Sequence, residues 1–575
     1  MRPRSVSRPA AATNRASSKF CGSTRKWRPP LPNNPAEDLK THIDKLRERL
    51  RARAGEPEAL FEIGLLILRE GSVARSVRLL ERACRIRPND ERFRTGLALA
   101  RARAHYEAGY PESALASLAG AIGPEVDRLR ASALTLAGRP AEAMPLLESL
   151  LRTWPAAHPE ARPTSSDHSA YLLNAHYTSA WPSVEHWHEH RRFESMFAEA
   201  LRGPVPPLSR SAGFRVGYLS AEFCQHTGAH TLLPVLRHHS SPGFEVFCYS
   251  NVARPDSRTA DFRAVAGDRW RDIHALSDDE AADLIRRDSL DLLVDTSGHM
   301  PGNRLLVFAR RPAPLQATWL GYPNTTGLDA IDFRFTDIIA DPPPVTDSLH
   351  SEQLVRLPGG FFCYPEPESL PPLPVPPMRN RGFVTFGSYN NFAKLSDATL
   401  DTWAEILRRV DRSRLVLKHF AGSDPAVRAR LMGCFEVRGV AAERVHVLPP
   451  YLEHSAHLQS LGTIDIALDP FPYNGTGTSL EALWMGVPFV ALAGDRHVSR
   501  VGMSLLNRVG LQEWIGADRP AYVDIACAWA RNPAGLAELR ATMRERLRAV
   551  PLGNAELFTR GLEASYRDLA GGLLP

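Results

Sequence analysis

The stretch DPFPYNGTGTSLEALWMGVPFVAL, residues 469–492, has the pattern of a strand end, a loop rich in Gly and Thr, and a helix that opens near Ser479. Such a loop at the start of a helix favours an anion, because unpaired backbone N–H groups and the positive end of the helix dipole face it. No Lys stands where a phosphate-binding P-loop requires one. The sequence must therefore supply the positive charge from elsewhere in the chain.

Short apolar runs rich in β-formers surround this stretch and alternate with helix-length segments, which is typical of parallel α/β sheets. One series is FRVGYLS (214–220), FEVFCYS (244–250), DLLVDTSG (291–298), LQATWLGY (315–322) and DFRFTD (332–337). The second series is GFVTFGSYN (382–390), RLVLKHF (414–420), RVHVLP (444–449), TIDIALDP (463–470) and VPFVALAG (487–494). A Pro-rich linker at 363–381 separates them. We predict two Rossmann-like domains, at 213–362 and 382–575, with ligands in the cleft between them.

Residues 37–157 have a helical pattern that repeats with a unit of roughly 34 residues, the length of a tetratricopeptide repeat. Three units share the spacing Gly-x4-Ala/Ser-x3-Leu, starting at Gly71, Gly109 and Gly138. Small residues at these positions let paired helices approach closely. We predict tetratricopeptide-like repeats, and a generic helical bundle is the alternative interpretation.

A bridge at 158–212 contains the His-rich helix SVEHWHEHRRFESMFAEAL. Its alternating His186, His188 and His190 cannot all face one metal on a helix. We interpret them as surface and packing residues.

The charge of the chain is concentrated at its beginning. The net charge is +6, yet the first 36 residues hold eight Lys or Arg and no Asp or Glu, so the rest carries −2. A nearly neutral body argues against a nucleic-acid partner. The segment 1–36 has too little apolar surface to fold, so we expect a disordered basic tail, with a transit peptide or an upstream-assigned start codon as alternatives.

Two further features bear on the compartment. No run of 18 apolar residues occurs, so we expect no membrane span. Seven scattered cysteines without a CxxC pair argue against a disulfide framework and a structural zinc site, and they fit a reducing cytoplasm.

The missing cation is predicted at Lys394, in the segment FGSYNNFAKLSD (386–397) that follows the first strand of the second series. That loop opens at the same carboxyl edge of the sheet, so Lys394 can reach the loop at 474–478 and neutralise a departing diphosphate. The alternative is a solvated lysine that begins the next helix, where it would oppose the helix dipole. Glu481, expected in the first turn of its helix, is either a dipole partner or an acceptor for ribose hydroxyls.

Four blocks together resemble the intracellular protein O-GlcNAc transferases: FRVGYLSAEFCQHTGAH, RPAPLQATWLGYPNTTG, FGSYNNFAKLSDATLDTWAEIL and DPFPYNGTGTSLEALWMGVP. The resemblance covers roughly residues 57–570, with repeats and catalytic blocks in the family's order. It implies an α/β fold in which a tetratricopeptide superhelix precedes two Rossmann-like domains in a GT-B arrangement. Because this chain has only about three repeats, the superhelix is shorter than in animal relatives, and packing on the catalytic region is an alternative to a long peptide groove.

The resemblance also implies roles for individual residues. Lys394 corresponds to the lysine that contacts the donor's phosphates, and His226 to an active-site histidine regarded as a general base or a positioning group. His457 corresponds to the histidine that stacks on uracil, and Glu481 to the ribose-binding acid, an aspartate in animal members. The other donor-side residues are Asn391, where animal enzymes have a glutamine, Leu452, His454, Tyr473, Thr476, Gly477 and Thr478.

Position along the chain suggests an acceptor side. His230 lies four residues after His226, and His299, Asn303 and Tyr322 lie in or beside loops of the first domain that can line the cleft. Gly and Pro in those loops are equally explained by turn formation. Asp288, Asp291 and Asp295 are further candidates for a general base, on position only.

The expected reaction is an inverting transfer of GlcNAc from UDP-GlcNAc to Ser or Thr hydroxyls of acceptor proteins. No DxD triplet occurs in the chain, so the usual carboxylate pair for a divalent metal is absent and no cofactor is expected. His226 or the donor's own α-phosphate would accept the hydroxyl proton. The alternatives are a GDP-fucose or UDP-glucose donor on the same architecture, or an inactive tetratricopeptide scaffold.

Overall fold

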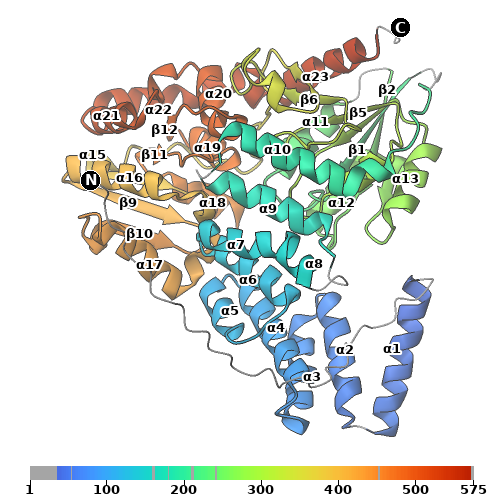
Figure 1. Ribbon diagram of the computed structural model, residues 1–575. Coiled ribbons are helices and arrows are strands. Elements are labelled where there is room, and N and C mark those ends of the chain that lie inside the picture. The colour runs from blue at the N-terminus through green and yellow to red at the C-terminus, as the bar shows by residue number, and fades with distance from the viewer. Residues whose placement is uncertain are drawn as a thin grey trace, which may run out of the picture.

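A computed structural model describes residues 35–53, 55–157, 162–178, 181–208, 213–239, 243–450 and 453–571. An all-helical region precedes two α/β domains, each built on one parallel sheet, which confirms the predicted fold class (Figure 1). Residues 1–34 of the expected tail lie outside the described residues, and α1 begins at Pro35. Among the described residues, none of the helices has both the length and the apolar composition to cross a bilayer.

The helical region consists of three antiparallel pairs with flanking helices. Its elements are α1 (Pro35–Ala52), α2 (Pro57–Arg69), α3 (Val73–Ile86), α4 (Glu91–Glu107), α5 (Pro111–Ser117), α6 (Pro124–Leu136), α7 (Pro140–Leu151), α8 (Thr153–Ala157), α9 (Ser165–Tyr177) and α10 (Ser183–Phe193). Gly71, Gly109 and Gly138 lie in the turns of the pairs α2–α3, α4–α5 and α6–α7, with φ of +81°, +81° and +79°. Other residue types adopt this left-handed conformation at a cost, which explains why the repeat begins on glycine.

The first α/β domain has a seven-stranded parallel sheet in the order β3-β2-β1-β4-β5-β6-β7. Its elements are β1 (Phe214–Ser220), α11 (Ala229–His238), β2 (Phe244–Ser250), α12 (Ser257–Ala266), β3 (Trp270–Asp272), α13 (Asp278–Arg287), β4 (Leu292–Asp295), α14 (Leu305–Ala309), β5 (Leu315–Thr318), β6 (Phe333–Thr336) and β7 (Gln353–Arg356). All five predicted strands are present. The edge strands β3 and β7 were not predicted.

The second α/β domain has a six-stranded parallel sheet in the order β10-β9-β8-β11-β12-β13. Its elements are α15 (Met378–Arg381), β8 (Val384–Ser388), η5 (Phe392–Lys394), α16 (Asp397–Arg409), β9 (Ser413–Lys418), α17 (Pro425–Glu436), β10 (Val445–Leu448), α18 (His454–Leu461), β11 (Ile466–Leu468), α19 (Gly477–Trp484), β12 (Phe489–Leu492), α20 (Val501–Arg508), β13 (Ile515–Gly516), α21 (Arg519–Ala530) and α22 (Pro533–Arg548). The five predicted strands are again present. Only β13, at the edge, is additional.

The last helix, α23 (Ala555–Leu569), crosses back to the first domain, a feature that the division of the sequence at 382 lacks (Figure 1). Tyr566 and Phe558 lie in the same apolar core as β1, β4, β5 and α11. The Tyr566 hydroxyl is 2.9 Å from the Tyr218 hydroxyl on β1, and the Phe558 ring stacks on Trp319 at 5.8 Å. The first sheet is therefore completed by the C-terminal end of the chain.

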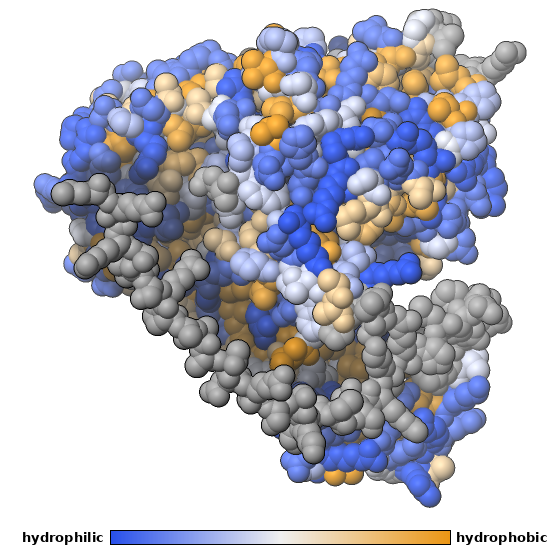
Figure 2. All heavy atoms as spheres, in the orientation of Figure 1, coloured by the Kyte–Doolittle hydropathy of each residue, from blue (hydrophilic) through white to orange (hydrophobic). Residues whose placement is uncertain are grey.

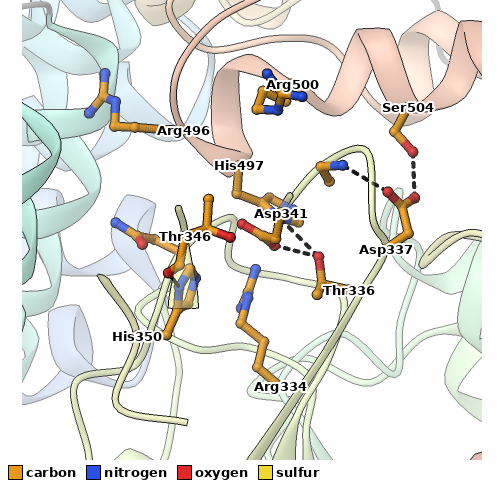
Figure 3. A network of polar contacts seen from close by, with 12 residues as sticks. Arg334, Thr336, Asp337, Asp341, Thr346, His350, Arg496, His497, Arg500 and Ser504 are labelled. Atoms are coloured by element: carbon orange, nitrogen blue, oxygen red, sulfur yellow. Dashed lines mark hydrogen bonds and ion pairs between the residues drawn. The ribbon is translucent and has the colours of Figure 1, made fainter. Parts of the chain in front are cut away.

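A buried polar network joins the two α/β domains at the carboxyl end of β6 (Figure 3). Asp341 accepts hydrogen bonds from Thr336 and from His497 Nδ1, the latter at 2.7 Å. Asp337 accepts from Ser504 at the start of α20 and from two backbone N–H groups of its own loop. Both carboxylates are fully buried. Breaking such contacts would leave buried carboxylates without hydrogen-bond partners, which is costly, so the network holds the two domains in one relative orientation.

The helical region packs on both α/β domains instead of standing apart from them. Arg254, after β2, forms an ion pair with Glu107 at 3.3 Å. The backbone N–H of Glu112 donates to Asp424 Oδ2 of the second domain at 3.0 Å. Figure 2 shows that the face presented here is mainly hydrophilic, with hydrophobic residues in small scattered groups. Because of the contacts of Glu107 and Glu112, the helical region forms one body with the α/β region.

The docking of α23 gives a test of the fold. Replacing Tyr566 by Ala leaves a cavity under the first sheet and removes the partner of Tyr218, which is expected to cost about 3–5 kcal/mol of unfolding free energy. Tyr566→Phe loses only the hydroxyl contact, about 0.5–1.5 kcal/mol. Thermal unfolding should therefore order the proteins wild type, Tyr566→Phe and Tyr566→Ala from highest to lowest Tm. Equal Tm values for wild type and Tyr566→Ala would show that α23 is not part of that core.

Candidate active site

The Gly- and Thr-rich loop lies at the carboxyl end of β11, as predicted, but its helix α19 begins at Gly477, two residues before the expected start. Glu481 consequently lies in the second turn, not the first, so its interpretation as a dipole partner is wrong. The first N–H groups of α19 have no partner within the helix. Together with the hydroxyl group of Thr476, they give the loop a row of donors.

Asp469 and Asn390 hold this loop in place through hydrogen bonds. Asp469 Oδ1 accepts from the backbone N–H of Gly475 at 2.7 Å and from Ser479 Oγ at 3.2 Å. Asn390 Oδ1 accepts from Thr478 Oγ1 at 3.2 Å. Asp469 and Asn390 are buried, so the loop is held by groups that water does not reach. Its donors are preorganised for an anion.

Lys394 reaches this loop from η5, as its position in the sequence predicts. Lys394 Nζ donates to the backbone carbonyl of Asn474 at 2.8 Å and lies 4.2 Å from the ring centroid of Tyr473. Burial lowers the pKa of Lys394, and the nearby carboxylate of Asp469 opposes that shift. Burial also disfavours the charged form of Asp469 and therefore raises the pKa of its carboxyl group. An anion placed on the loop would stabilise the ammonium form of Lys394.

A second polar cluster surrounds Glu481. Glu481 Oε1 accepts from the Tyr364 hydroxyl at 3.1 Å, and Oε2 lies 3.0 Å from His457 Nε2. Burial alone would raise the pKa of Glu481, but the hydrogen bond and charge of His457 outweigh it and lower the pKa. Lys418 contacts His457 Nδ1, and burial lowers the pKa of Lys418 to about 8. The carboxylate is thus ionised and surrounded by donors.

Aromatic rings continue this cluster across the cleft between the domains. His230 of the first domain stacks on His454 of the second, with centroids 4.7 Å apart, and His454 is 6.0 Å from His457. Burial lowers the pKa of His230 to about 4, so it is a neutral ring at physiological pH. A cavity of about 210 Å³ adjoins His230, His454 and Tyr364. Flat, mostly uncharged rings of this kind suit stacking with a nucleobase.

His226 lies where the first domain meets the Gly/Thr loop. A Cβ atom on Gly477 would come within 2.3 Å of the methyl group of Thr227, the residue that follows His226. Glycine at 477 therefore lets the two loops touch. The His226 side chain is 45% exposed, and its Nδ1 lies 3.1 Å from Glu222 Oε2. Burial opposes the charged imidazolium, but the hydrogen bond and charge of Glu222 outweigh it and raise the pKa of His226.

Three of the predicted acceptor-side residues, His299, Asn303 and Tyr322, contact the helical bridge. His299 and Tyr322 are buried. His299 Nδ1 is 2.9 Å from Ser169 Oγ of α9, and the Tyr322 hydroxyl lies 2.8 Å from His190 Nε2 of α10. Asn303 also donates to Ser169 Oγ, at 3.3 Å. These contacts fasten the helical bridge to the first domain, and His230 lies on the donor side instead.

The remaining predicted residues have other surroundings. Asn391 caps η5 by accepting from the N–H of Ala393 at 3.0 Å. Leu452 lies outside the described residues. The three aspartates considered as bases are each engaged, Asp288 by Arg271, Asp291 by the N–H of Arg215, and Asp295 by the N–H groups of Ser297 and Gly298. Burial raises the pKa of Asp295 to about 6, but no donor site residue contacts it.

In the bridge, His186 and His190 are buried and His188 is exposed, in agreement with their interpretation as packing and surface residues.

No group of three or more His, Cys, Asp or Glu side chains in the described ranges is arranged to hold a metal ion.

Sequence reasoning missed six residues of the site: Asn390, Asp469, Lys418, Tyr177, Tyr364 and Glu222. Asp469 and Lys418 each stand at the carboxyl end of a predicted strand, a position that could have identified them. Asn390 immediately precedes the predicted Asn391. Tyr177, whose ring stacks on Tyr473 at 5.1 Å, belongs to α9 and carries no local signal for the site.

Known proteins resemble this chain in sequence and in fold. The sequence profile of glycosyl transferase family 41 matches residues 205–373 and 379–562. A Hordeum vulgare protein named "Probable UDP-N-acetylglucosamine--peptide N-acetylglucosaminyltransferase SPINDLY" is 40% identical over 383 residues, covering 66% of this chain and 40% of that protein. The Arabidopsis thaliana protein of the same name with the ending SEC is 29% identical over 372 residues, covering 63% of this chain and 38% of that protein.

A solved structure also matches over most of the chain. A mutant of the Thermobaculum terrenum O-GlcNAc transferase has a TM-score of 0.83 and 34% identity, covering 90% of this chain and 98% of that one. The chain spans about 40% of the length of the plant relatives.

The pair formed by Glu222 and His226 gives a test that needs no substrate. Glu222→Gln removes the charge that stabilises the imidazolium, so the pKa of His226 should fall and the neutral ring should persist to lower pH. Diethylpyrocarbonate modifies the neutral ring, so mass spectrometry of the His226 peptide should show the midpoint of its pH–rate curve shifted to lower pH. Glu245→Gln, on β2, is the control with an unchanged midpoint. A Glu222→Gln curve superimposed on that of wild type would contradict the assignment.

Proposed function

This chain belongs to glycosyl transferase family 41, and we propose that it transfers GlcNAc from UDP-GlcNAc to Ser or Thr hydroxyls of acceptor proteins. The observation that carries the proposal is the convergence of Lys394 Nζ on the backbone of the 474–478 loop, 2.8 Å from the Asn474 carbonyl. A diphosphate seated there would meet an ammonium group and the N–H groups of α19. The names of the relatives and of the matching structure support the choice of sugar and acceptor.

The leaving group explains why a partly buried lysine serves this reaction. As the acceptor oxygen forms its bond to the anomeric carbon, the bond to the donor's phosphate oxygen breaks, and UDP takes the electron pair. Negative charge therefore grows on the diphosphate, where Lys394 and the N–H groups of α19 stabilise it more in the transition state than in the ground state. Attack from the face opposite UDP inverts the anomeric centre and gives a β-linked sugar.

His226 is the side chain placed to receive the proton. Its loop touches the Gly/Thr loop through Thr227, and its side chain is partly open to solvent. An imidazole accepts a proton only when neutral, so transfer should increase as pH rises through the raised pKa of His226. The donor's α-phosphate is the other acceptor for this proton.

The cluster around Glu481 fits the nucleoside. We assign the stacking position to His457 and His454 and the ribose contact to the carboxylate of Glu481, which lies 3.0 Å from His457 Nε2. Lys394 and the loop N–H groups perform the charge neutralisation for which many nucleotide-sugar enzymes use a divalent metal, so the proposal includes no metal. A cytoplasmic location is supported by the six described cysteines, all of which are free.

Lys394 gives the direct test of the mechanism. Lys394→Ala should lower kcat by at least about 100-fold, because it removes a charge that stabilises the leaving group. Purified protein is incubated with UDP-GlcNAc and a bacterial lysate, and acceptor proteins heavier by one sugar are counted by mass spectrometry. Lys45→Ala, at an exposed position on α1, is the matched control with unchanged transfer. Equal transfer by Lys394→Ala and wild type would exclude this mechanism.

The donor is tested by ligand-induced thermal stabilisation. A nucleotide at 100 times its Kd stabilises a folded protein by about 2.7 kcal/mol, so a true donor raises Tm measurably. UDP and UDP-GlcNAc should raise Tm, while GDP-fucose should not, and UDP-glucose should have a smaller effect than UDP-GlcNAc. Stabilisation by GDP and GDP-fucose alone would replace the proposed donor by a fucosyl donor. No response to any of the nucleotides would favour the inactive scaffold.

A further inference from the structure

The turn that carries Lys394 is held from outside by the helical region. All three residues of η5 touch that region or a side chain seated on it. Phe392 meets the turn between α6 and α7, Ala393 packs in a cluster with Leu173 and Tyr177 of α9, and Lys394 lies over the Tyr473 ring that stacks on Tyr177. We infer that the α6–α7 turn and α9 position Lys394, so that the helical region helps to set the geometry of the donor site. This inference rests on the function proposed above.

The first contact is a close approach of two backbones. A Cβ atom on Gly138 would lie 2.9 Å from the carbonyl oxygen of Phe392 and 3.0 Å from its Cβ. Atoms of a main chain cannot rotate away as a flexible side chain does, so a side chain at 138 must displace η5 or the α6–α7 turn. Glycine is thus required at position 138 for two reasons: its φ is +79°, and the backbone of Phe392 leaves no room for a side chain.

The residue before Gly138 is built into the second domain. Ala137 is fully buried in the apolar core that contains Phe392 and Leu395, on either side of Lys394. Its carbonyl oxygen accepts from the guanidinium of Arg430 on α17. The end of α6 is therefore anchored to the domain that binds the donor, and it transmits its position directly to η5.

The second contact passes through two aromatic rings. Tyr177, the last residue of α9, stacks on Tyr473 with ring centroids 5.1 Å apart and an interplanar angle of 21°. Lys394 Nζ lies 4.2 Å from the centroid of the same Tyr473 ring. A cation held over an aromatic face loses its place when the ring tilts. Helix α9 is itself fixed, because His176 Nε2 lies 3.0 Å from the Tyr322 hydroxyl.

The other repeat glycines show that this contact is specific to one turn. The turn at Gly71 faces the flexible guanidinium of Arg254 in the first domain, and the turn at Gly109 faces Phe420, beyond the end of β9. Gly120, after α5, also has a left-handed φ, +75°, but a Cβ there would meet nothing within 4 Å. Among the glycines that the structure describes, only Gly138 combines a left-handed φ with contact to the turn that carries Lys394.

Gly138→Ala and Gly120→Ala therefore form a matched pair. Both substitutions place a methyl group at a left-handed position of the helical region, so both incur similar backbone strain. Only Gly138→Ala pushes on Phe392. Displacing a charged group by about 1 Å costs on the order of 100-fold in rate, so Gly138→Ala should raise the Kd for UDP and the KM for the donor roughly tenfold or more and lower kcat. Gly120→Ala should match wild type in all three.

Tyr177 supplies a second pair that does not depend on backbone strain. Tyr177→Ala removes the ring under Tyr473 and should weaken UDP binding in the same direction as Gly138→Ala. Tyr177→Phe keeps the stacked ring and should recover most of the affinity. Isothermal titration with UDP measures Kd, initial rates over a range of UDP-GlcNAc concentrations separate KM from kcat, and circular dichroism gives the Tm of each variant.

The outcomes separate positioning from simple packing. A merely structural role lowers the folded fraction, which reduces the maximal rate and leaves the UDP Kd and the donor KM at their wild-type values; that result overturns the inference. Wild-type values for Kd, KM and kcat in both Gly138→Ala and Tyr177→Ala overturn it as well, while leaving the proposed function intact. Failure of the wild-type protein to bind UDP removes the proposed function and the inference together.

Discussion

The structure depends on how one partly buried ammonium group, that of Lys394, is stabilised. Burying a charged amine is unfavourable unless other groups replace its water. Here a carbonyl oxygen of Asn474, the face of Tyr473 and the charge of Asp469 do so for Lys394. These partners belong to the loop after β11 and its flanks, so the amine and the anion-binding backbone are assembled by the same contacts. The site is thus already shaped to bind an anion.

Three parts of the chain surround the site that contains Lys394. The second domain contributes the amine and the loop, the first contributes His226 and His230, and the helical region contributes Tyr177 and the turn at Gly138. The buried carboxylates of Asp337 and Asp341 hold the two α/β domains together. Since each part is fixed to both others, the geometry of the site reflects the whole assembly.

Much of the fold could be predicted because its strands are apolar runs with a clear period, and because Gly recurs at one spacing in the helical pairs. The strands β3, β7 and β13 are two to four residues long and lie at sheet edges, so they leave little trace in the sequence. The contacts of Lys394 and Thr478 were predictable, because both residues follow the carboxyl ends of strands, whereas Glu481 lies one turn further into its helix than predicted. The contacts of Tyr177 and Gly138 were not predictable, because their relation to Lys394 arises only when distant segments pack. The contacts of His299 and Tyr322 with α9 and α10 could not be predicted for the same reason.

The return of α23 to the first sheet has a consequence for synthesis of the chain. The core of that sheet needs Phe558 and Tyr566, which leave the ribosome just over 200 residues after β7. At a translation rate of about 5–20 residues per second, this interval is roughly 10–40 s. During it, the apolar face beneath β1 and β4 is uncovered. The first α/β domain therefore completes its core only after α23 has been synthesised. A chaperone that shields such an apolar surface would have time to act before α23 covers it.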